Sequence, residues 1–343
     1  MNRVTIKDVA RRAGYSITTV SMVLNRKNVC IPDATRAKVW DAVQELGYRP
    51  NQLAVSMVTK KTHVLGLIIP DNSNMFFAEL SKAVERAARQ AGYGLIYGNS
   101  SNDSKRDVQY IEMFADRQVD GIIFAKSASL ADEDDVHLLQ CIDRCLLPFV
   151  TVDRQIQGSD VCAVLLNHFK GGYLATRHLL SLGHKKIGAY TGPSDLLSSN
   201  ERLAGYRSAL EEAGVPYDEA LVFEGNYQYT DCSEALRHFM NRGVSAIFCF
   251  NDLMAFGLYR ELAIAGLYIP ENISIVGFDN VILSDVIQPA LTTVEQPIAD
   301  MGKVAVNLLV RLIDGEDIPK NKRKSIFEPR LLIRSSAAEY GKG

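Results

Sequence analysis

The chain of 343 residues is longer than one ordinary hydrophobic core organises, so two or three domains are expected. Hydrophobic residues make up 47% of it, yet no run of eighteen apolar residues predicts a membrane span, and the polar N-terminus lacks the pattern of a secretory signal. The six cysteines are scattered, several within apolar runs, which favours buried free thiols. These features indicate a cytoplasmic protein without a membrane partner.

The net charge of −2 is unevenly distributed along the chain. Residues 1–61 carry eleven Lys and Arg against four acidic residues, a surplus of seven positive charges that leaves −9 for the remaining 282 residues. A basic module on an acidic body predicts a polyanionic partner, and the alternative is a solvated basic surface without one.

Three short helical patterns fit within residues 5–47. Apolar residues recur at helical spacing in each, with Val39, Trp40, Val43 and Leu46 forming the stripe of the third. Capping and breaking residues stand at the ends of the patterns: Thr5 with Asp8, Gly14, Ser16 with Thr19, Pro32 with Asp33, and Gly47. The sequence therefore predicts an all-α unit of three helices.

The second predicted helix carries an unusual outer face of short hydroxyl and amide side chains. Two helices joined by a tight glycine-containing turn form the helix-turn-helix unit, whose second helix enters the DNA major groove. Such side chains are common partners of phosphates and base edges, whereas a generic three-helix bundle has no need of them. This row consists of Ser16, Thr18, Thr19, Ser21 and Asn25.

The order of these motifs resembles the headpiece of the LacI/GalR repressor family, and the resemblance extends over essentially the whole chain. It rests on Thr5-Ile6-Lys7-Asp8-Val9-Ala10, Ala13-Gly14, Thr19-Val20-Ser21, Val23-Leu24-Asn25, Thr35-Arg36 and Leu46-Gly47-Tyr48-Arg49-Pro50-Asn51. The DNA-binding residues that the resemblance implies are Thr5, Ser16, Ile17, Thr18, Thr19, Ser21, Met22, Asn25, Asn51, Ala54 and Met57.

The resemblance departs from the family pattern at a position that matters for DNA recognition. Met22 stands where the family usually has an Arg that pairs with guanine, and Met donates no hydrogen bond. Ile17 and Thr18 occupy the positions that vary with the operator sequence. We therefore expect an operator that differs from the common family consensus.

Residues 50–61 follow a headpiece of residues 1–49 and are expected to form a hinge. The resemblance implies a helix that folds on operator DNA, pairs with its dimer mate and inserts Met57 into the minor groove. Val55 stands where an Arg is common. A plain linker is the alternative.

Residues 62–343 change to short apolar strands that alternate with helical stretches, which predicts parallel sheets covered on both faces. Two such sets predict two doubly wound subdomains: residues 62–162 with 292–325, and residues 163–291 with 326–340. The expected strands lie at residues 64–69, 94–97, 121–124, 148–152, 186–190, 246–250, 273–278, 291–294 and 330–334. The resemblance implies a sensor like the periplasmic binding proteins.

Ligands of open α/β sheets bind beyond the carboxyl ends of the strands, and polar and aromatic groups follow most strands here. Aromatic rings with carboxylates, amides and Arg are the chemistry of a sugar site, and the set resembles that of ribose-type binding proteins. Individual residues have structural alternatives, such as a helix cap for Asp279 or core packing for Phe77. The expected effector-binding residues are Asn74, Phe76, Phe77, Asp153, Arg154, Arg202, Asn251, Asp279 and Gln296.

The effector is expected to be a pentose or, second, a hexose, while some relatives respond to a purine or a phosphorylated partner protein. No phosphate loop, dinucleotide fingerprint, metal-ligand cluster or nucleophile elbow is found, so no catalysis, metal or cofactor is expected. A sugar-active enzyme would need a catalytic group, and a transport component would need a secretory signal. The leading hypothesis is a repressor, with a sugar-binding transport component as the alternative.

The expected assembly is a homodimer on a pseudo-palindromic operator, because two-fold symmetry of the protein is mirrored in its site. The chain ends at Gly343, soon after the last expected strand and without an added heptad helix, so a dimer rather than a tetramer is expected.

Overall fold

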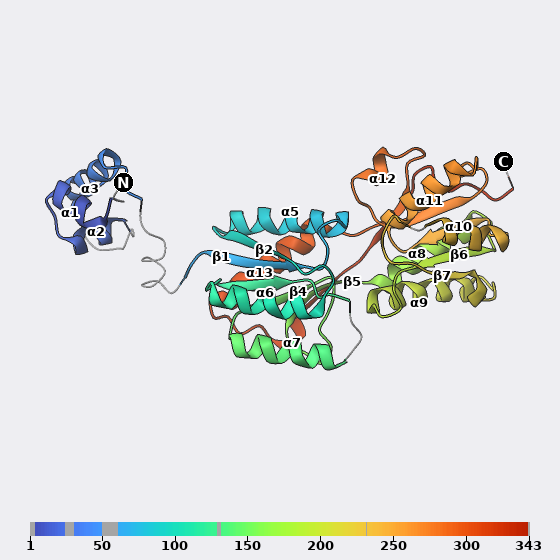
Figure 1. The fold of residues 1–343 in the computed structure, drawn as a ribbon, viewed down its shortest axis with the longest axis horizontal. Helices are drawn as coiled ribbons and strands as arrows, with labels where there is room; N and C mark the ends of the chain where they lie inside the picture. Colours follow the sequence, from blue (N-terminus) through green and yellow to red (C-terminus); the bar gives the residue numbers. More distant parts are fainter. Residues whose placement is uncertain (1–3, 25–30, 50–60, 129–131, 231, 342–343) are drawn as a thin grey trace. The chain divides into compact units, whose positions relative to one another are not determined.

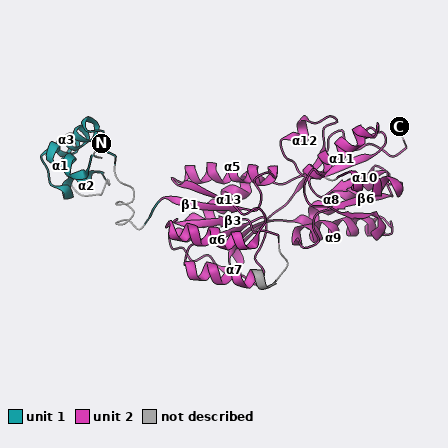
Figure 2. Ribbon diagram, viewed as in Figure 1, with its two compact units in different colours: residues 1–62 teal, residues 63–343 magenta. Residues whose placement is uncertain are grey.

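A computed structural model describes residues 4–24, 31–49, 61–128, 132–230 and 232–341 of the chain, with the side chains of residues 132–134 left out. The chain divides into two compact units, residues 1–62 and residues 63–343 (Figure 2). Among the described residues, no helix is both long enough and apolar enough to cross a membrane.

The described residues of the first unit form the helices α1 (Ile6–Ala13), α2 (Ile17–Leu24) and α3 (Asp33–Glu45). The backbone N–H of Thr5 donates to the Asp8 carboxylate at 3.0 Å, and Ser16 Oγ accepts from the backbone N–H of Thr19 at 3.1 Å, so both predicted caps are present. The buried core of this unit consists of Val9, Ala10, Val20, Val23, Val39 and Ala42.

Trp40 does not lie on the buried face of α3, where the sequence pattern placed it. Its side chain is 41% exposed, whereas Val39 and Ala42 are buried. Successive residues of a helix point about 100° apart, so a residue next to Val39 turns away when Val39 and Ala42 define the inner face.

In the second unit, one six-stranded parallel sheet has the order β11-β5-β4-β3-β1-β2. Helices α5 and α13 cover one face and helices α6 and α7 cover the other (Figure 1). The strands are β1 (Val64–Ile69), β2 (Gly94–Asn99), β3 (Gly121–Phe124), β4 (Phe149–Val152), β5 (Cys162–Leu166) and β11 (Lys324–Phe327). The helices are α5 (Met75–Gln90), α6 (Ser104–Asp116), α7 (Asp132–Cys145) and α13 (Ile298–Ile313).

The other sheet has the order β12-β10-β9-β8-β6-β7, and only β12 runs antiparallel to its neighbour among the pairs described. Its strands are β6 (Ile187–Thr191), β7 (Val222–Glu224), β8 (Ala246–Cys249), β9 (Ser274–Asp279), β10 (Thr292–Glu295) and β12 (Arg330–Leu332). Its helices are α8 (His168–Ser181), α9 (Leu197–Glu212), α10 (Cys232–Asn241), α11 (Asp252–Ile264) and α12 (Leu283–Val286), with the short 3₁₀ turn η1 (Glu219–Leu221). A second such turn, η2 (Lys320–Lys322), contacts β11 of the first sheet.

The chain crosses between the two sheets after β5, after β10 and between β11 and β12, and the expected subdomain boundary at each of the three crossings needs correction. The sequence prediction assigned residues 163–166 and 326–327 to the second subdomain and residues 292–295 to the first. Strand β5 pairs with β4 and β11 pairs with β5 in the first sheet, whereas β10 pairs with β9 in the second. An apolar strand pattern indicates that both faces of a strand are buried, but it does not indicate which other strand pairs with it.

Helices α8 and α9 approach each other at two glycines, and this contact fixes the backbone around Arg202. A Cβ added at Gly172 would lie 2.1 Å from the carbonyl oxygen of Arg202, and one added at Gly205 would lie 2.0 Å from the carbonyl oxygen of Phe169. Real Cβ atoms do not approach this closely, so both positions require glycine.

A buried carboxylate joins the segments that follow β9. Asp252 accepts hydrogen bonds from the backbone N–H of Val281 at 3.0 Å and from the hydroxyls of Ser284 and Thr293, each at 2.6 Å. Burial outweighs these bonds and raises the pKa of Asp252 to about 6 from an ordinary value of 3.8.

We predict that Gly205→Ala destabilises the protein by about 1–3 kcal/mol, because the added methyl group forces α8 and α9 apart. At a solvent-exposed helix position the same substitution would stabilise the folded state by about 1 kcal/mol through helix propensity. The sign of the change in unfolding free energy therefore distinguishes the two situations. Urea unfolding followed by circular dichroism measures the change. The exposed neighbour supplies a control, Ala204→Ser, which should stay within about 0.5 kcal/mol of wild type. A more stable Gly205→Ala protein would contradict the close contact.

The raised pKa of Asp252 predicts that part of the folding stability disappears as pH rises. The folded state holds the proton more tightly than the unfolded state, so this contribution is complete below pH 4 and is lost between about pH 4 and about pH 6. Asp252→Asn should therefore reduce the fall in unfolding free energy from pH 4 to pH 7 by about 2 kcal/mol. Urea unfolding at both pH values tests this, with Asp300→Asn, which removes an exposed carboxylate, as control. Equal pH dependence in wild type and Asp252→Asn would contradict it.

Candidate functional site

One cavity of about 30 Å³ lies between the two sheets, beyond the carboxyl ends of their strands. All nine residues that the sequence analysis selected for the effector line it, together with two that it missed. The eleven are Asn74, Phe76, Phe77, Asp153, Arg154, Ser198, Arg202, Tyr227, Asn251, Asp279 and Gln296. We call this space the inner cavity.

Two asparagines of the inner cavity also begin helices. Asn74 Oδ1 accepts from the backbone N–H of Phe76 at 3.0 Å, and Asn251 Oδ1 accepts from the backbone N–H of Met254 at 2.9 Å. A capping side chain has a fixed direction, and each keeps an amide NH₂ group as a donor. The Asn251 amide donates to the carbonyl oxygen of Tyr227 at 3.0 Å.

Arg154 and Asp153 are held entirely within the half of the sensor that contains the first sheet. Arg154 Nη1 donates to the carbonyl oxygen of Lys126 at 2.7 Å, and its guanidinium lies 5.5 Å from the centre of the Phe77 ring. The Phe76 and Phe77 rings meet edge to face at 5.0 Å. Arg154 Nε lies 3.5 Å from Asp153 Oδ2, within ion-pair distance.

Arg202 organises the other half of the site and is only 5% exposed. Its Nε donates to His168 Nδ1 at 3.2 Å, and its Nη1 donates to the carbonyl oxygen of Phe250. The guanidinium stacks at 3.6 Å from the centre of the Phe278 ring and lies 3.9 Å from Asp279 Oδ1. A buried cation is thus compensated by a ring face, a carboxylate and two acceptors.

The two aspartates of the inner cavity are buried and strained. Burial raises the pKa of Asp153 and, more strongly, that of Asp279, while the nearby arginines oppose the rise. Both have positive backbone φ, 68° for Asp153 and 117° for Asp279, although neither is glycine. Such conformations cost of order 1–3 kcal/mol each and concentrate at functional sites.

Three buried polar atoms of the inner cavity make no hydrogen bond within the described part of the chain. Gln296 Nε2 donates to Asp279 Oδ1 at 2.7 Å, but Gln296 Oε1 accepts from no group, Arg154 Nε donates to none, and the Tyr227 hydroxyl has no partner. A buried polar atom without a partner costs free energy of about 1–3 kcal/mol. A ligand hydroxyl can donate to the first atom and accept from the second.

Two of the described hydrogen bonds connect the halves of the sensor. Gln228 Nε2 donates to Asp71 Oδ2 at 3.0 Å, and the backbone N–H of Ile282 donates to Glu79 Oε1, also at 3.0 Å. Asp71 and Glu79 belong to the first-sheet half, and their partners belong to the second.

Of the two cavity residues that the sequence analysis missed, the sequence pattern could have identified one but not the other. Tyr227 follows β7, a strand of three residues that the apolar pattern did not predict. Ser198 lies four residues before Arg202 in α9, so helical spacing places both on one face and could have identified it.

In the headpiece unit, Ile17 and Thr18 are exposed at the start of α2, while Ser21 and Met22 are half-buried. Ser16 and Thr19 bond to each other, and the Thr5 hydroxyl donates to Asp8 at 2.7 Å. Asn25, Asn51, Ala54, Val55 and Met57 lie outside the described residues, so their predicted DNA roles stay predictions.

Comparison with family models gives two matches. Residues 5–51 match the model described as bacterial regulatory proteins of the lacI family. Residues 62–329 match the model described as periplasmic binding proteins and sugar binding domain of the LacI family.

Curated relatives match over nearly their whole length. The transcriptional regulator DegA of Bacillus subtilis is 36% identical, with 98% of each chain covered. The transcriptional repressor PurR of Vibrio atlanticus is 38% identical over 97% of this chain and 98% of its own. These relatives are transcriptional regulators and not enzymes, in agreement with the sequence prediction.

Solved structures support the same assignment. A Lac repressor dimer bound to operator and the anti-inducer ONPF is 26% identical, with a TM-score of 0.86 over 98% of this chain and all of that one. The regulator CelR in complex with cellobiose has 30% identity and a TM-score of 0.73, covering 98% of this chain and 100% of that chain. A regulator from Enterococcus faecium with bound ribose has 30% identity and a TM-score of 0.71 over 80% and 99%. The chain therefore belongs to the LacI family and is a transcriptional regulator with a DNA-binding headpiece and a ligand-binding sensor.

Proposed function

We propose that this regulator is a repressor that binds a pseudo-palindromic operator as a homodimer, and that a sugar in the inner cavity controls its affinity for DNA. The observation that carries the proposal is that the nine predicted residues line one cavity. In it, Gln296 Oε1 and Arg154 Nε make no hydrogen bond to any described residue. The DNA partner implies that the regulator acts in the cytoplasm.

The chemistry of the inner cavity favours a polyol over other small molecules. Carboxylates held beside guanidinium groups can form paired hydrogen bonds with adjacent hydroxyls, and the Phe76 and Phe77 rings can stack on C–H faces. The chain is similar to regulators solved with ribose and with D-xylulofuranose. A pentose is therefore the first candidate and a hexose the second.

The effector would act by joining the two halves of the sensor. Asp153, Arg154 and the phenylalanines belong to one half, while Arg202, Asp279 and Asn251 belong to the other, so a sugar that bonds to both stabilises the closed form. Thermodynamic linkage then requires that bound DNA changes the protein's affinity for the effector by the same factor as bound effector changes its affinity for DNA.

We predict that the chain binds D-ribose, D-xylose or D-glucose and that Asp279→Asn weakens this binding by about 10–100-fold, because a charge-assisted pair of hydrogen bonds is lost. A thermal-shift screen finds the sugar, since ligands that bind only the folded state raise the melting temperature. Titration calorimetry then measures the affinity. Asp116→Asn, an exposed carboxylate on α6, is the matched control.

Two outcomes would contradict this assignment. Unchanged sugar affinity in Asp279→Asn would remove that residue from the site. Binding of adenine or guanine and of none of the sugars would replace the sugar with a purine.

We predict that Met22→Arg shifts the preferred base within each operator half-site toward guanine, since Arg pairs bidentately with guanine at a gain of about 1–3 kcal/mol. Selection from a library of randomised half-sites measures the preference. Met240→Arg adds the same charge on a partly exposed residue of α10, outside the headpiece, and should leave base preference unchanged. An identical preference in Met22→Arg and wild type would show that residue 22 does not face the groove.

A further inference from the structure

The chain passes from the headpiece unit into the sensor at His63, directly before β1, and we call this point the junction. In the first sheet β1 lies between β3 and β2, so the segments that precede both neighbouring strands flank the junction. Any force between the sensor and a DNA-bound headpiece that acts along the chain passes through this point. The direction in which the chain leaves the junction therefore matters for DNA binding.

Hydrogen bonds hold the backbone of His63 from both sides. Its N–H donates to Asp120 Oδ2 at 2.8 Å, and its carbonyl oxygen accepts from the N–H of Gly94 at 2.8 Å. Asp120 also donates its own N–H to the carbonyl oxygen of Val64 at 2.8 Å. A bond from an N–H to a carboxylate is stronger than one between neutral groups. The first residues of the sensor are thus tied to the amino ends of β2 and β3.

The backbone of His63 has a conformation that an ordinary strand start does not need. Its φ is 55°, in the left-handed region that is sterically disfavoured for residues with a Cβ. Such a conformation persists where the surroundings over-determine it, and it concentrates where the strain has a role. The His63 ring meets that of Tyr93 at 5.6 Å, and Tyr93 is only 8% exposed in the core of the first-sheet half. A plain strand start would explain the bond from Gly94 but neither the φ nor the carboxylate acceptor.

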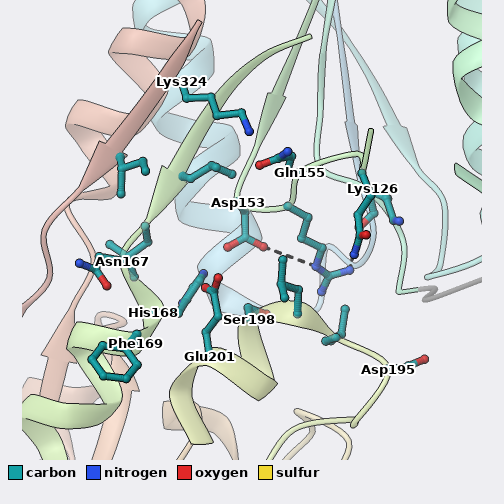
Figure 3. A pocket seen from close by; sticks show the side chains of 17 residues that line it. Lys126, Asp153, Gln155, Asn167, His168, Phe169, Asp195, Ser198, Glu201 and Lys324 are labelled. Atoms are coloured by element: carbon teal, nitrogen blue, oxygen red, sulfur yellow. Dashed lines mark hydrogen bonds and ion pairs between the residues drawn. The ribbon is translucent and has the colours of Figure 1, made fainter. Parts of the chain in front are cut away.

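The junction lies at the amino edge of the first sheet, opposite the edge that carries residues of the inner cavity. Asp153 follows β4 at that other edge and forms an ion pair with Arg154 (Figure 3). The six residues of β1 span about 20 Å between the edges, and each pairs with a residue of β2. Because paired strands move together, the junction follows any rotation of the first-sheet half.

We propose that Asp120 is a positioning residue for DNA binding, which fixes the direction in which the chain leaves the sensor by holding the N–H of His63. This proposal rests on the proposed homodimer on a pseudo-palindromic operator and deepens it, because it names a group that sets the accepted spacing of the half-sites. Without the carboxylate, the strained backbone of His63 relaxes to an extended conformation and redirects the chain.

The spacing of the half-sites is a measure of this direction. Once one headpiece of a dimer has bound, the second binds with an effective concentration that depends on whether its tether spans the distance to the second half-site. A tether that leaves the sensor in a fixed direction reaches one spacing well and other spacings poorly. A tether that leaves in variable directions reaches several spacings about equally, and the favoured one less well.

Operator duplexes with one base pair removed from or added to the centre of the selected operator test the proposal with the full chain. Fluorescence anisotropy measures the affinity for each duplex and for a duplex that carries a single half-site. We expect wild type to prefer one spacing by at least about tenfold, and Asp120→Ala to reduce this preference to about threefold or less. Affinity for the single half-site should stay within about twofold of wild type. Asp120→Asn keeps a carbonyl oxygen as acceptor and should keep most of the preference. Asp116→Ala, which removes an exposed carboxylate of α6, is the matched control.

A second pair of variants changes the donor instead of the acceptor. His63→Pro removes the N–H group and cannot adopt a positive φ, so it should lose the spacing preference as Asp120→Ala does. His63→Gly keeps the N–H group and adopts a positive φ without steric cost, so it should keep the preference. Both variants lose the ring contact with Tyr93, so this loss cancels in the comparison. His63 is exposed, and both variants are expected to fold.

The outcomes separate this proposal from the one on which it rests. A wild-type spacing preference in Asp120→Ala or in His63→Pro, or equal losses in Asp120→Ala and Asp120→Asn, would each overturn the role of Asp120 alone. Wild type without a spacing preference would overturn the fixed direction of the chain. One bound chain per operator would overturn the homodimer, and the positioning role with it. Unchanged melting temperatures of the variants exclude a folding defect as the cause.

Discussion

The buried guanidinium of Arg202 is the constraint on which the second half of the sensor depends. A cation that is 5% exposed has lost its water and must find compensation in the protein. The compensating groups are the Phe250 carbonyl after β8, the Asp279 carboxylate at the end of β9 and the His168 ring at the start of α8, and they converge at one edge of the sheet. The glycine contact between α8 and α9 holds the backbone of Arg202 in place for all of them.

The two arginines of the inner cavity are compensated separately, and this separation makes the cavity responsive to a ligand. The described hydrogen bonds and ion pairs of Arg154 lie within the first-sheet half, and those of Arg202 lie within the second. Separating the two halves would therefore break neither the contacts of Arg154 nor those of Arg202. The halves share the Gln228–Asp71 and Ile282–Glu79 hydrogen bonds, whose loss is inexpensive in water. A ligand that bonds to both arginines can thus decide between open and closed forms.

Sequence reasoning located the inner cavity because the rule for parallel sheets concerns strand ends, and most strands here are apolar enough to be recognised. It missed Tyr227 because the half-exposed strand β7 has little apolar pattern. It placed β10 in the wrong sheet because strand pairing depends on the path of the chain through the crossings, which local composition does not encode. Trp40 was assigned to the apolar stripe of the third helix beside Val39, whereas the helical phase of α3 turns its side chain outward. The volume of the cavity depends on side-chain packing, which no residue pattern encodes.

The crossings between the sheets offer a route by which the proposed effector can change the relative position of the two halves. Gln296 lies on the crossing segment between β10 and α13, and it lines the inner cavity with an unsatisfied Oε1. The other two crossings are tied to each other, because Asn167 Nδ2 donates to Glu328 Oε1 at 3.0 Å. A ligand that engages Gln296 therefore contacts one of the three crossings directly. Because three neighbouring segments join the halves, a hinge motion about this region is the expected way for contacts at the cavity to reach the far ends of both sheets.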